Sequence, residues 1–269
     1  MRVKLIQSFF VFFLASVLAF SVSAFEVYDE VRFSNKPDLT QYRFSKLRMI
    51  YTGSFWKTGE DKRLLPPRQR VFDFVNNKYA NYGGFLVPDI EHWSFRGSDA
   101  QIAASVTKYL TLLGWIKSAA PNAMVGYYAR PPLRDYHRAK LDPSAVRYQE
   151  WQKHNDRLAP LANAQDAFFP SLYTFDDNQT LWVKAAIGNV SEAKRLGNGK
   201  PVCVYINPYY HQAAYGSLAN QPIPKDYFLL QLQTLKKYAD CAVIWSGKRI
   251  PWNEQASWWL ATKEFLSAN

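Results

Sequence analysis

Short apolar runs alternate along this chain with longer stretches in which apolar residues recur every three or four positions. The short runs predict buried strands, and the longer stretches predict amphipathic helices. We expect strands at Val27 to Phe33, Leu47 to Thr52, Gly84 to Asp89, Ala123 to Ala129, Ala167 to Thr174, Val202 to Asn207 and Cys241 to Ser246. We expect helices at Arg68 to Tyr79, Ser98 to Ala119, Ser144 to Leu158, Gln179 to Arg195, Lys225 to Tyr238 and Glu254 to Leu266.

The lengths of the connections indicate where a functional site would lie. Loops that leave the predicted strands are long, as at Gly53 to Pro67 and Pro208 to Pro224, whereas loops that enter strands are short, as at Pro121-Asn122. In a (β/α) barrel the loops leaving the strands build the active face, and an open doubly wound sheet would use the same end. No glycine-rich nucleotide loop follows an early strand, so we expect an α/β fold that is a distorted (β/α) TIM-like barrel with about seven strands.

The first residues have the pattern of an export signal. Arg2 and Lys4 precede an apolar run from Leu5 to Val22, and Val22-Ser23-Ala24 is a small-residue cleavage site. We therefore predict a signal peptide at residues 1–24, a single barrel domain at residues 25–269, and a secreted or periplasmic protein without stable membrane insertion. An uncleaved membrane anchor is the alternative, because the apolar run approaches the length of a membrane span.

Charge and cysteines change this picture only slightly. Removal of the leader lowers the formal net charge from +11 to +9, so an anionic partner is expected, and nucleic acid, an acidic polysaccharide and a membrane or wall surface all qualify. Cys203 and Cys241 are disulfide candidates in an oxidising compartment. Each lies near the start of an apolar strand, so a buried free thiol is the other interpretation.

Two carboxylates one residue apart end the predicted strand Gly84 to Asp89. Side chains two apart on a strand share a face, so Asp89 and Glu91 should project together. Neighbouring carboxylates resist ionising together, which separates their pKa values and suits glycosidic bond cleavage. The four histidines lack metal-ligand spacing, no Gly-x-Ser-x-Gly elbow is present, and neither cysteine has a neighbouring base.

Aromatic residues recur at the ends of the other predicted strands, and such rings can stack on the apolar faces of sugars. The substrate-binding candidates are Trp93, Tyr127, Tyr173, Tyr210 and Trp245.

Four blocks resemble the hyaluronidase family of glycoside hydrolases, in the same order along the chain. Val87-Pro88-Asp89-Ile90-Glu91-His92-Trp93 is similar to that family's Asp-x-Glu-x-Trp strand end, and Phe169-Pro170-Ser171-Leu172-Tyr173 is similar to its Phe-Pro-Ser-Ile-Tyr run. Val202 to Tyr210 resembles its strand and tyrosine-bearing loop, and Ala242 to Trp245 resembles its strand ending in tryptophan.

The resemblance implies a retaining endoglycosidase that uses the substrate's own acetamido oxygen as nucleophile. Glu91 would be the general acid/base and Asp89 its partner, Tyr173 and Tyr210 would hold the acetamido group, and Trp245 would floor the sugar subsite. The implied substrate is an anionic N-acetylhexosamine-containing polysaccharide such as hyaluronan, chondroitin or a bacterial glycan. No nucleic acid, metal or organic cofactor is implied, and we expect a monomer.

Two alternatives stay open at this level. One is a non-catalytic glycan-binding barrel protein, because a fold does not fix a function. The other uses Asp176 or Asp177 as the second carboxylate of a conventional retaining or inverting hydrolase.

Overall fold

The fold is known from a computed structural model, which describes residues 25–268. The predicted signal peptide at residues 1–24 lies outside the described residues, and the single-domain assignment of residues 25–269 stays a prediction. Within the described range, no helix has the length and apolar character that crossing a bilayer requires.

Two parallel sheets form the centre of the molecule. In one sheet the strand order is β2-β1-β7-β6, and in the other it is β3-β4-β5. All of these pairings are parallel, as the alternation of strands and helices predicted. The strands are β1 (Glu26–Val31), β2 (Phe44–Ser45), β3 (Arg48–Tyr51), β4 (Phe85–Asp89), β5 (Met124–Val125), β6 (Cys203–Ile206) and β7 (Cys241–Ser246).

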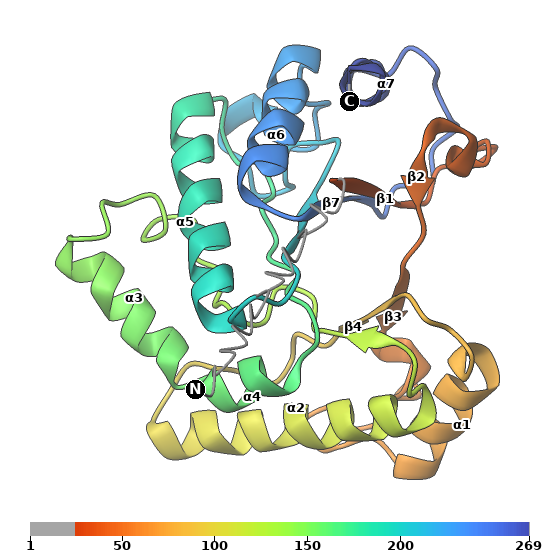
Figure 1. Cartoon of the computed structure of the whole chain (residues 1–269), viewed down its shortest axis with the longest axis vertical. Coiled ribbons are helices and arrows are strands. Elements are labelled where there is room, and N and C mark those ends of the chain that lie inside the picture. Colours follow the sequence, from red (N-terminus) through yellow and green to blue (C-terminus); the bar gives the residue numbers. More distant parts are fainter. Residues whose placement is uncertain (1–24, 269) are drawn as a thin grey trace, which may run out of the picture.

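Helices cover the outer face of each sheet (Figure 1). The first sheet is covered by α5, α6 and α7, whereas α1, α2 and α4 cover the second. The α-helices are α1 (Arg68–Tyr79), α2 (Asp99–Ala119), α3 (Val146–Asp156), α4 (Ala159–Ala164), α5 (Gln179–Gly197), α6 (Lys225–Tyr238) and α7 (Ser257–Ser267). Short 3₁₀ turns occur at η1 (Leu39–Tyr42), η2 (Thr52–Ser54) and η3 (Gly216–Leu218).

Local sequence signals set several helix ends. Ser98 and Gln101 form a reciprocal capping box at the start of α2. Asn198 takes the left-handed conformation where α5 ends, and Gly199 follows with a φ of 88°. The helix predicted from Ser144 to Leu158 is shorter than expected, and α4 begins directly after it with Pro160 in its first turn.

The predicted strand Ala167 to Thr174 is present only as isolated bridges. The carbonyl of Phe169 accepts from Ala129 N, whereas the carbonyl of Phe168 accepts from Cys203 N, so the segment joins β6 to the chain after β5. Pro170 has no N–H and interrupts a regular ladder. On the other side, no backbone ladder between described residues joins β1 or β2 to β3. The fold is therefore α/β with parallel sheets, and the expected closure into a barrel is not shown.

Side chains from both sheets meet in one buried cluster between them. Tyr28 of β1, Val87 of β4, Tyr205 of β6 and Val243 of β7 all belong to it. Each fully buried side chain of this size contributes about 1.5–3 kcal/mol to folding. The cluster fixes the two sheets relative to each other and supports the ends of their strands.

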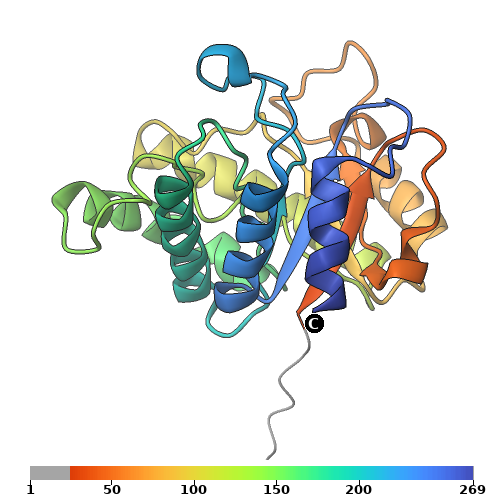
Figure 2. The ribbon, with the colours of Figure 1, turned by 90° about the horizontal axis from the view of Figure 1, so that it is seen from above.

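The two ends of the strands differ in character. Cys203 and Cys241 are paired in register at the amino ends of β6 and β7, with Cα atoms 4.4 Å apart, and they form a disulfide. The interpretation as buried free thiols is thus wrong. The long loops leave the carboxyl ends, and Figure 2 shows the loop with η3 and the loop before α1 rising on one side of the molecule.

Candidate active site

The alternation along β4 carries the acidic pair into the space between the sheets. Phe85 and Val87 face the interior cluster, whereas Leu86 packs against the outer helices. Asp89 continues the interior face, and Glu91 follows two residues later, just past the end of the strand. Both carboxylates line a cavity of about 400 Å³ at the carboxyl ends of the strands. The prediction that they project together is confirmed.

The backbone after β4 is held by side chains from three other segments. Each of them donates a hydrogen bond to a carbonyl oxygen of the acidic segment. The donors are Thr52 Oγ1 to Asp89 O at 2.9 Å, Tyr109 OH to Ile90 O at 2.6 Å and Arg130 Nη2 to Glu91 O at 3.0 Å. With its carbonyls engaged in this way, the segment presents its carboxylates in a preorganised position.

The two carboxylates have different electrostatic environments. Burial and, to a lesser extent, the negative charge of Glu91 together raise the pKa of Asp89 to about 6, while Arg130 and Arg134 oppose the shift. The Glu91 side chain is 43% exposed, and its Oε2 lies 3.6 Å from Nη2 of Arg134.

Aromatic rings also line this cavity. Tyr173 and Trp245 stack with ring centroids 5.7 Å apart and planes 16° apart, and Tyr173 also stacks on His211. Trp245 Nε1 donates to the hydroxyl of Tyr51 at 3.0 Å. Tyr210 lines the same cavity. The structure thus brings Asp89, Glu91, Tyr173, Tyr210 and Trp245 together around one cavity.

Two of the predicted substrate-binding residues lie elsewhere. Trp93 is 2% exposed and donates from Nε1 to Lys62 O, while Tyr127 is 0% exposed and donates to the carbonyl of Tyr109. Both rings pack in the cluster beneath α2 on the outer side of the sheet. Neither contacts the cavity, so neither enters the site proposed below.

Tyr128 takes the place expected for Tyr127, because successive residues of an extended chain face opposite ways. Its hydroxyl donates to Ser171 Oγ at 3.0 Å, and its ring lines the cavity. Sequence reasoning also missed Arg134, His211 and Lys248, which line the cavity from loops. The available signal was their position on the long segments that leave strands, since such loops build the sites of α/β proteins.

The alternative second carboxylates do not reach this cavity. Asp176 Oδ1 accepts from Asn178 N at 2.9 Å, and Asn178 in turn caps the start of α5. Neither Asp176 nor Asp177 lines the cavity that holds Asp89. The geometry therefore gives no support to a conventional pair that includes either residue.

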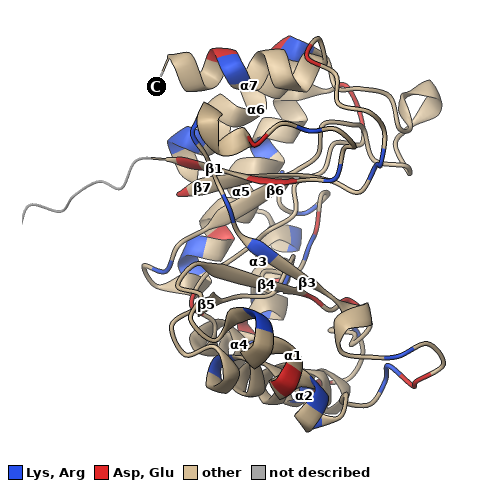
Figure 3. Cartoon of the chain, turned by 90° about the vertical axis from the view of Figure 1, so that its right-hand side faces the viewer, with Lys and Arg blue, Asp and Glu red and all other residues tan. Residues whose placement is uncertain are grey.

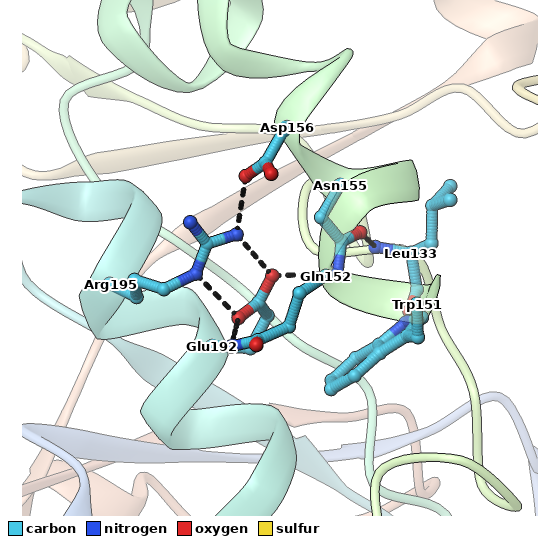
Figure 4. A network of polar contacts seen from close by, with 7 residues as sticks. All are labelled: Leu133, Trp151, Gln152, Asn155, Asp156, Glu192 and Arg195. Atoms are coloured by element: carbon cyan, nitrogen blue, oxygen red, sulfur yellow. Dashed lines mark hydrogen bonds and ion pairs between the residues drawn. The ribbon is translucent and has the colours of Figure 1, made fainter. Parts of the chain in front are cut away.

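Arg134 is supported by a buried polar network (Figure 4). The residue before it, Leu133, donates from N to Asn155 Oδ1 at 2.8 Å, and its carbonyl accepts from Trp151 Nε1 at 2.9 Å. Asn155 donates to Glu192, which is 0% exposed and also accepts two hydrogen bonds from Arg195. These bonds tie α3 to α5 and fix the chain that carries Arg134.

A larger hollow of about 770 Å³ lies at the other end of the strands, around Glu26, Met124 and Cys241. Parallel-sheet proteins place their sites at the carboxyl ends of strands, so the smaller cavity with the acidic pair is the candidate site. Among residues 25–268, no group of three His, Cys, Asp or Glu side chains could hold a metal ion.

The fold is α/β, with parallel sheets, and it is similar to the folds of several solved glycoside hydrolases. Bee venom hyaluronidase is similar in structure with a TM-score of 0.61 and 17% identity, over 91% of this chain and 98% of that chain. Bee venom hyaluronidase in complex with a hyaluronic acid tetramer gives the same TM-score and identity, over 90% and 95%. An endo-1,4-beta-D-mannanase from Thermotoga petrophila RKU-1 has a TM-score of 0.50 and 14% identity, over 75% of this chain and 64% of that chain.

These similarities concern the fold, because the identities are low. The resemblance to hyaluronidases that four short blocks predicted is confirmed at that level. No family model matches the chain, and no curated protein matches it by sequence.

Proposed function

We propose that this protein is an exported retaining endoglycosidase that hydrolyses an N-acetylhexosamine-containing polysaccharide by substrate-assisted catalysis. One observation carries the proposal: two carboxylates in unlike environments line one cavity together with a stacked pair of aromatic rings. The similarity of the fold to bee venom hyaluronidase supports the choice of reaction. Hyaluronan, chondroitin and a bacterial glycan are the candidate substrates.

In the proposed reaction Glu91 donates a proton to the glycosidic oxygen while the acetamido oxygen of the substrate attacks the anomeric carbon. The bond to the leaving sugar breaks, and a cyclic oxazolinium intermediate forms. Asp89 accepts a hydrogen bond from the acetamido N–H and stabilises the positive charge that develops there. Water then attacks the anomeric carbon and gives its proton to Glu91, which restores the enzyme and retains the configuration.

The reaction needs Asp89 in its ionised form, although burial raises the pKa of that carboxyl to about 6. A bound acetamido group would favour ionisation, because its N–H donates to Asp89 and stabilises the charged form of that carboxyl. Tyr173 and Tyr210 would orient the acetamido group, and Trp245 would support the sugar ring.

The wider assignments belong to the same proposal. The two sheets would be parts of one distorted (β/α) barrel in a single domain, as their shared interior cluster supports. The disulfide and the export pattern in residues 1–24 support a secreted or periplasmic protein, which we propose acts as a monomer.

The test is hydrolysis by the wild type and by Glu91→Gln, measured as new reducing ends from hyaluronan, chondroitin, chitin oligosaccharides and peptidoglycan fragments. Loss of a general acid predicts a fall in kcat of about 10²–10⁴-fold with an unchanged fold. Full activity of Glu91→Gln on a substrate that the wild type cleaves would contradict the mechanism. Binding without cleavage across the whole set would instead support a non-catalytic glycan-binding protein.

A further inference from the structure

The two sheets part from each other between β1 and β3. The strands β2 and β3 belong to one run of chain, with only Lys46 and Leu47 between them. The first of these strands pairs with Val27 and Tyr28 of β1, whereas the second pairs with β4. In Figure 3 the sheet with β1 and β7 lies above the sheet with β3 and β4. We call the gap between β3 and the last residues of β1, 29–31, the seam.

Three side-chain contacts cross the seam, although no backbone ladder between described residues does. Glu30 accepts a hydrogen bond from the backbone N–H of Met49. The guanidinium carbon of Arg32 lies 4.2 Å from the centre of the Tyr51 ring. Trp245 of β7, which pairs in register with Glu30, donates from Nε1 to the hydroxyl of Tyr51 at 3.0 Å. Side chains therefore close the seam.

Glu30 is the acidic member of these contacts, and it belongs to the interior face of β1. Tyr28, two residues earlier on the same face, packs in the buried cluster between the sheets. Burial and, to a lesser extent, the charge of Asp29 raise the pKa of Glu30 to about 7. Because β3 pairs with β4 alone, N–H groups on its other edge have no ladder partner among the described residues and need another acceptor. The carboxyl of Glu30 supplies one.

The position of β3 matters for the candidate site, because residues of β3 and of η2 directly after it reach that site. Met49 lines the cavity with the acidic pair. Tyr51 pairs in register with Asp89, and the hydroxyl of Thr52 donates to the carbonyl of Asp89. Trp245 lies on the other side of the seam. The separation between the acidic pair and the Trp245 ring therefore depends on how β3 is held against β1.

We propose that Glu30 is a positioning residue, which ties β3 to β1 across the seam and so fixes the ring of Trp245 relative to Asp89. The inference rests on the proposed function, since that function assigns Trp245 to the sugar subsite. From the Glu30 carboxyl the tie runs to the N–H of Met49. Two residues further along β3, the hydroxyl of Tyr51 holds Nε1 of Trp245. Glu30 does not line the cavity, so it acts on the sugar through these contacts alone.

The main experiment compares Glu30→Leu with Glu30→Gln. Leucine has a similar size but accepts no hydrogen bond from Met49, whereas glutamine keeps an oxygen acceptor. Because the pKa of Glu30 is about 7, the carboxyl is partly protonated at neutral pH, and glutamine matches that form in shape. We expect Glu30→Leu to raise KM about tenfold with little change in kcat, because the sugar floor serves the bound substrate and the transition state alike. Glu30→Gln should recover the KM of the wild type.

Glu26→Leu is the matched control. Glu26 is the same residue type on the same strand, four positions earlier, and it is exposed at the amino end. Its replacement should leave both KM and kcat at the values of the wild type. A wild-type KM in Glu30→Leu would overturn the proposal, and so would a failure of Glu30→Gln to recover the KM.

Tyr51→Phe tests the last link of the tie, and it keeps the proposal testable if Glu30→Leu does not fold. The substitution removes the hydroxyl that accepts from Trp245 and leaves the ring that Arg32 covers. We expect a raised KM, and a smaller rise when Glu30→Leu is already present, because both changes then loosen the same ring. An unchanged KM in Tyr51→Phe would refute the path. Equal effects in the two backgrounds would show that Glu30 does not act through Tyr51.

Hydrogen exchange separates this inference from the catalytic proposal, because it needs no turnover. The amide of Met49 should exchange about tenfold faster in Glu30→Leu than in the wild type, and at the wild-type rate in Glu30→Gln. If all three proteins exchange this amide equally, the tie is wrong even when hydrolysis is confirmed. If exchange responds as expected and the wild type binds oligosaccharides without cleaving them, the catalytic proposal alone fails. Calorimetric affinities then replace KM in the comparisons above.

Discussion

Replacement of Asp89 by asparagine should stabilise the protein while removing activity. Burial and the charge of Glu91 raise the pKa of Asp89 to about 6, so at neutral pH the folded protein holds an ionised group in a place that disfavours the charge. Asparagine has nearly the same shape and carries no charge. The substitution therefore relieves the cost of ionisation and leaves the packing of the cavity in place.

The size of the effect follows from the difference between the pKa of Asp89 in the unfolded chain, 3.8, and its pKa of about 6 in the folded protein. A raised pKa contributes stability at pH values below the unfolded pKa, and this contribution is lost as the pH rises through the folded pKa. At pH 7 the loss amounts to about 3 kcal/mol, at pH 5 to about 1.5 kcal/mol, and below the unfolded pKa it vanishes. Asp89→Asn should therefore be more stable than the wild type by these amounts.

Urea denaturation of both proteins at pH 5 and pH 7 measures the difference directly. Asp73→Asn is the control, because Asp73 is exposed on α1, and it should change the free energy of unfolding by less than about 0.5 kcal/mol. In a protein that already carries Glu91→Gln, Asp89→Asn should raise the free energy of unfolding by less, since the charge of Glu91 is the second cause of the raised pKa of Asp89. Equal or lower stability of Asp89→Asn at pH 7 would refute the reasoning, as would a gain that does not depend on pH.

Two further predictions concern the scaffold. Glu192→Gln removes the buried charge that pairs with Arg195, so the free energy of unfolding should fall by about 3 kcal/mol. Thermal melts measure this loss, and a melting temperature equal to that of the wild type would show that the charge of Glu192 is dispensable. Asp156→Asn is the matched comparison, because Asp156 is the exposed partner of Arg195, and it should lower the free energy of unfolding by less. Replacing both Cys203 and Cys241 by alanine opens a loop of 38 residues, so the free energy of unfolding measured by urea denaturation should fall by about 4 kcal/mol. The kcat for a substrate that the wild type cleaves should not change. A changed kcat would show that the strand amino ends influence the site.

The sequence predicted the elements whose periodicity is long and regular. The bounds of α1 and α6 are those expected, because the amphipathic period is regular along both helices. The helix α2 begins directly after Ser98, which caps it as its sequence signal indicated. The two-residue β2 is too short to show a period. The segment at Ala167 to Thr174 is apolar and buried like a strand, but Pro170 and the change of partner between β5 and β6 are not visible in a periodic pattern.

The candidate site was predictable where alternation continues from a strand. Asp89 lies in register with the interior residues of β4, and Trp245 lies near the end of β7, so their common cavity follows from the parallel sheet. Tyr127 and Tyr128 differ by one position, and the sequence does not show which of them faces inward where β5 ends early. Arg134 reaches Glu91 from a loop that α3 and α5 hold, and tertiary contacts of that kind leave no local pattern.

The disulfide between Cys203 and Cys241 fastens β6 to β7 at the end opposite to the acidic pair. The covalent tie and the acidic pair therefore lie at opposite ends of the parallel strands, the tie on β6 and β7 and the pair at the end of β4. A loop at the carboxyl end, such as residues 207–224, can be lengthened, shortened or exchanged without disturbing the bond that joins the strands. This separation makes the scaffold suited to acquiring new sugar specificities, whether through natural divergence or through loop grafting in the laboratory.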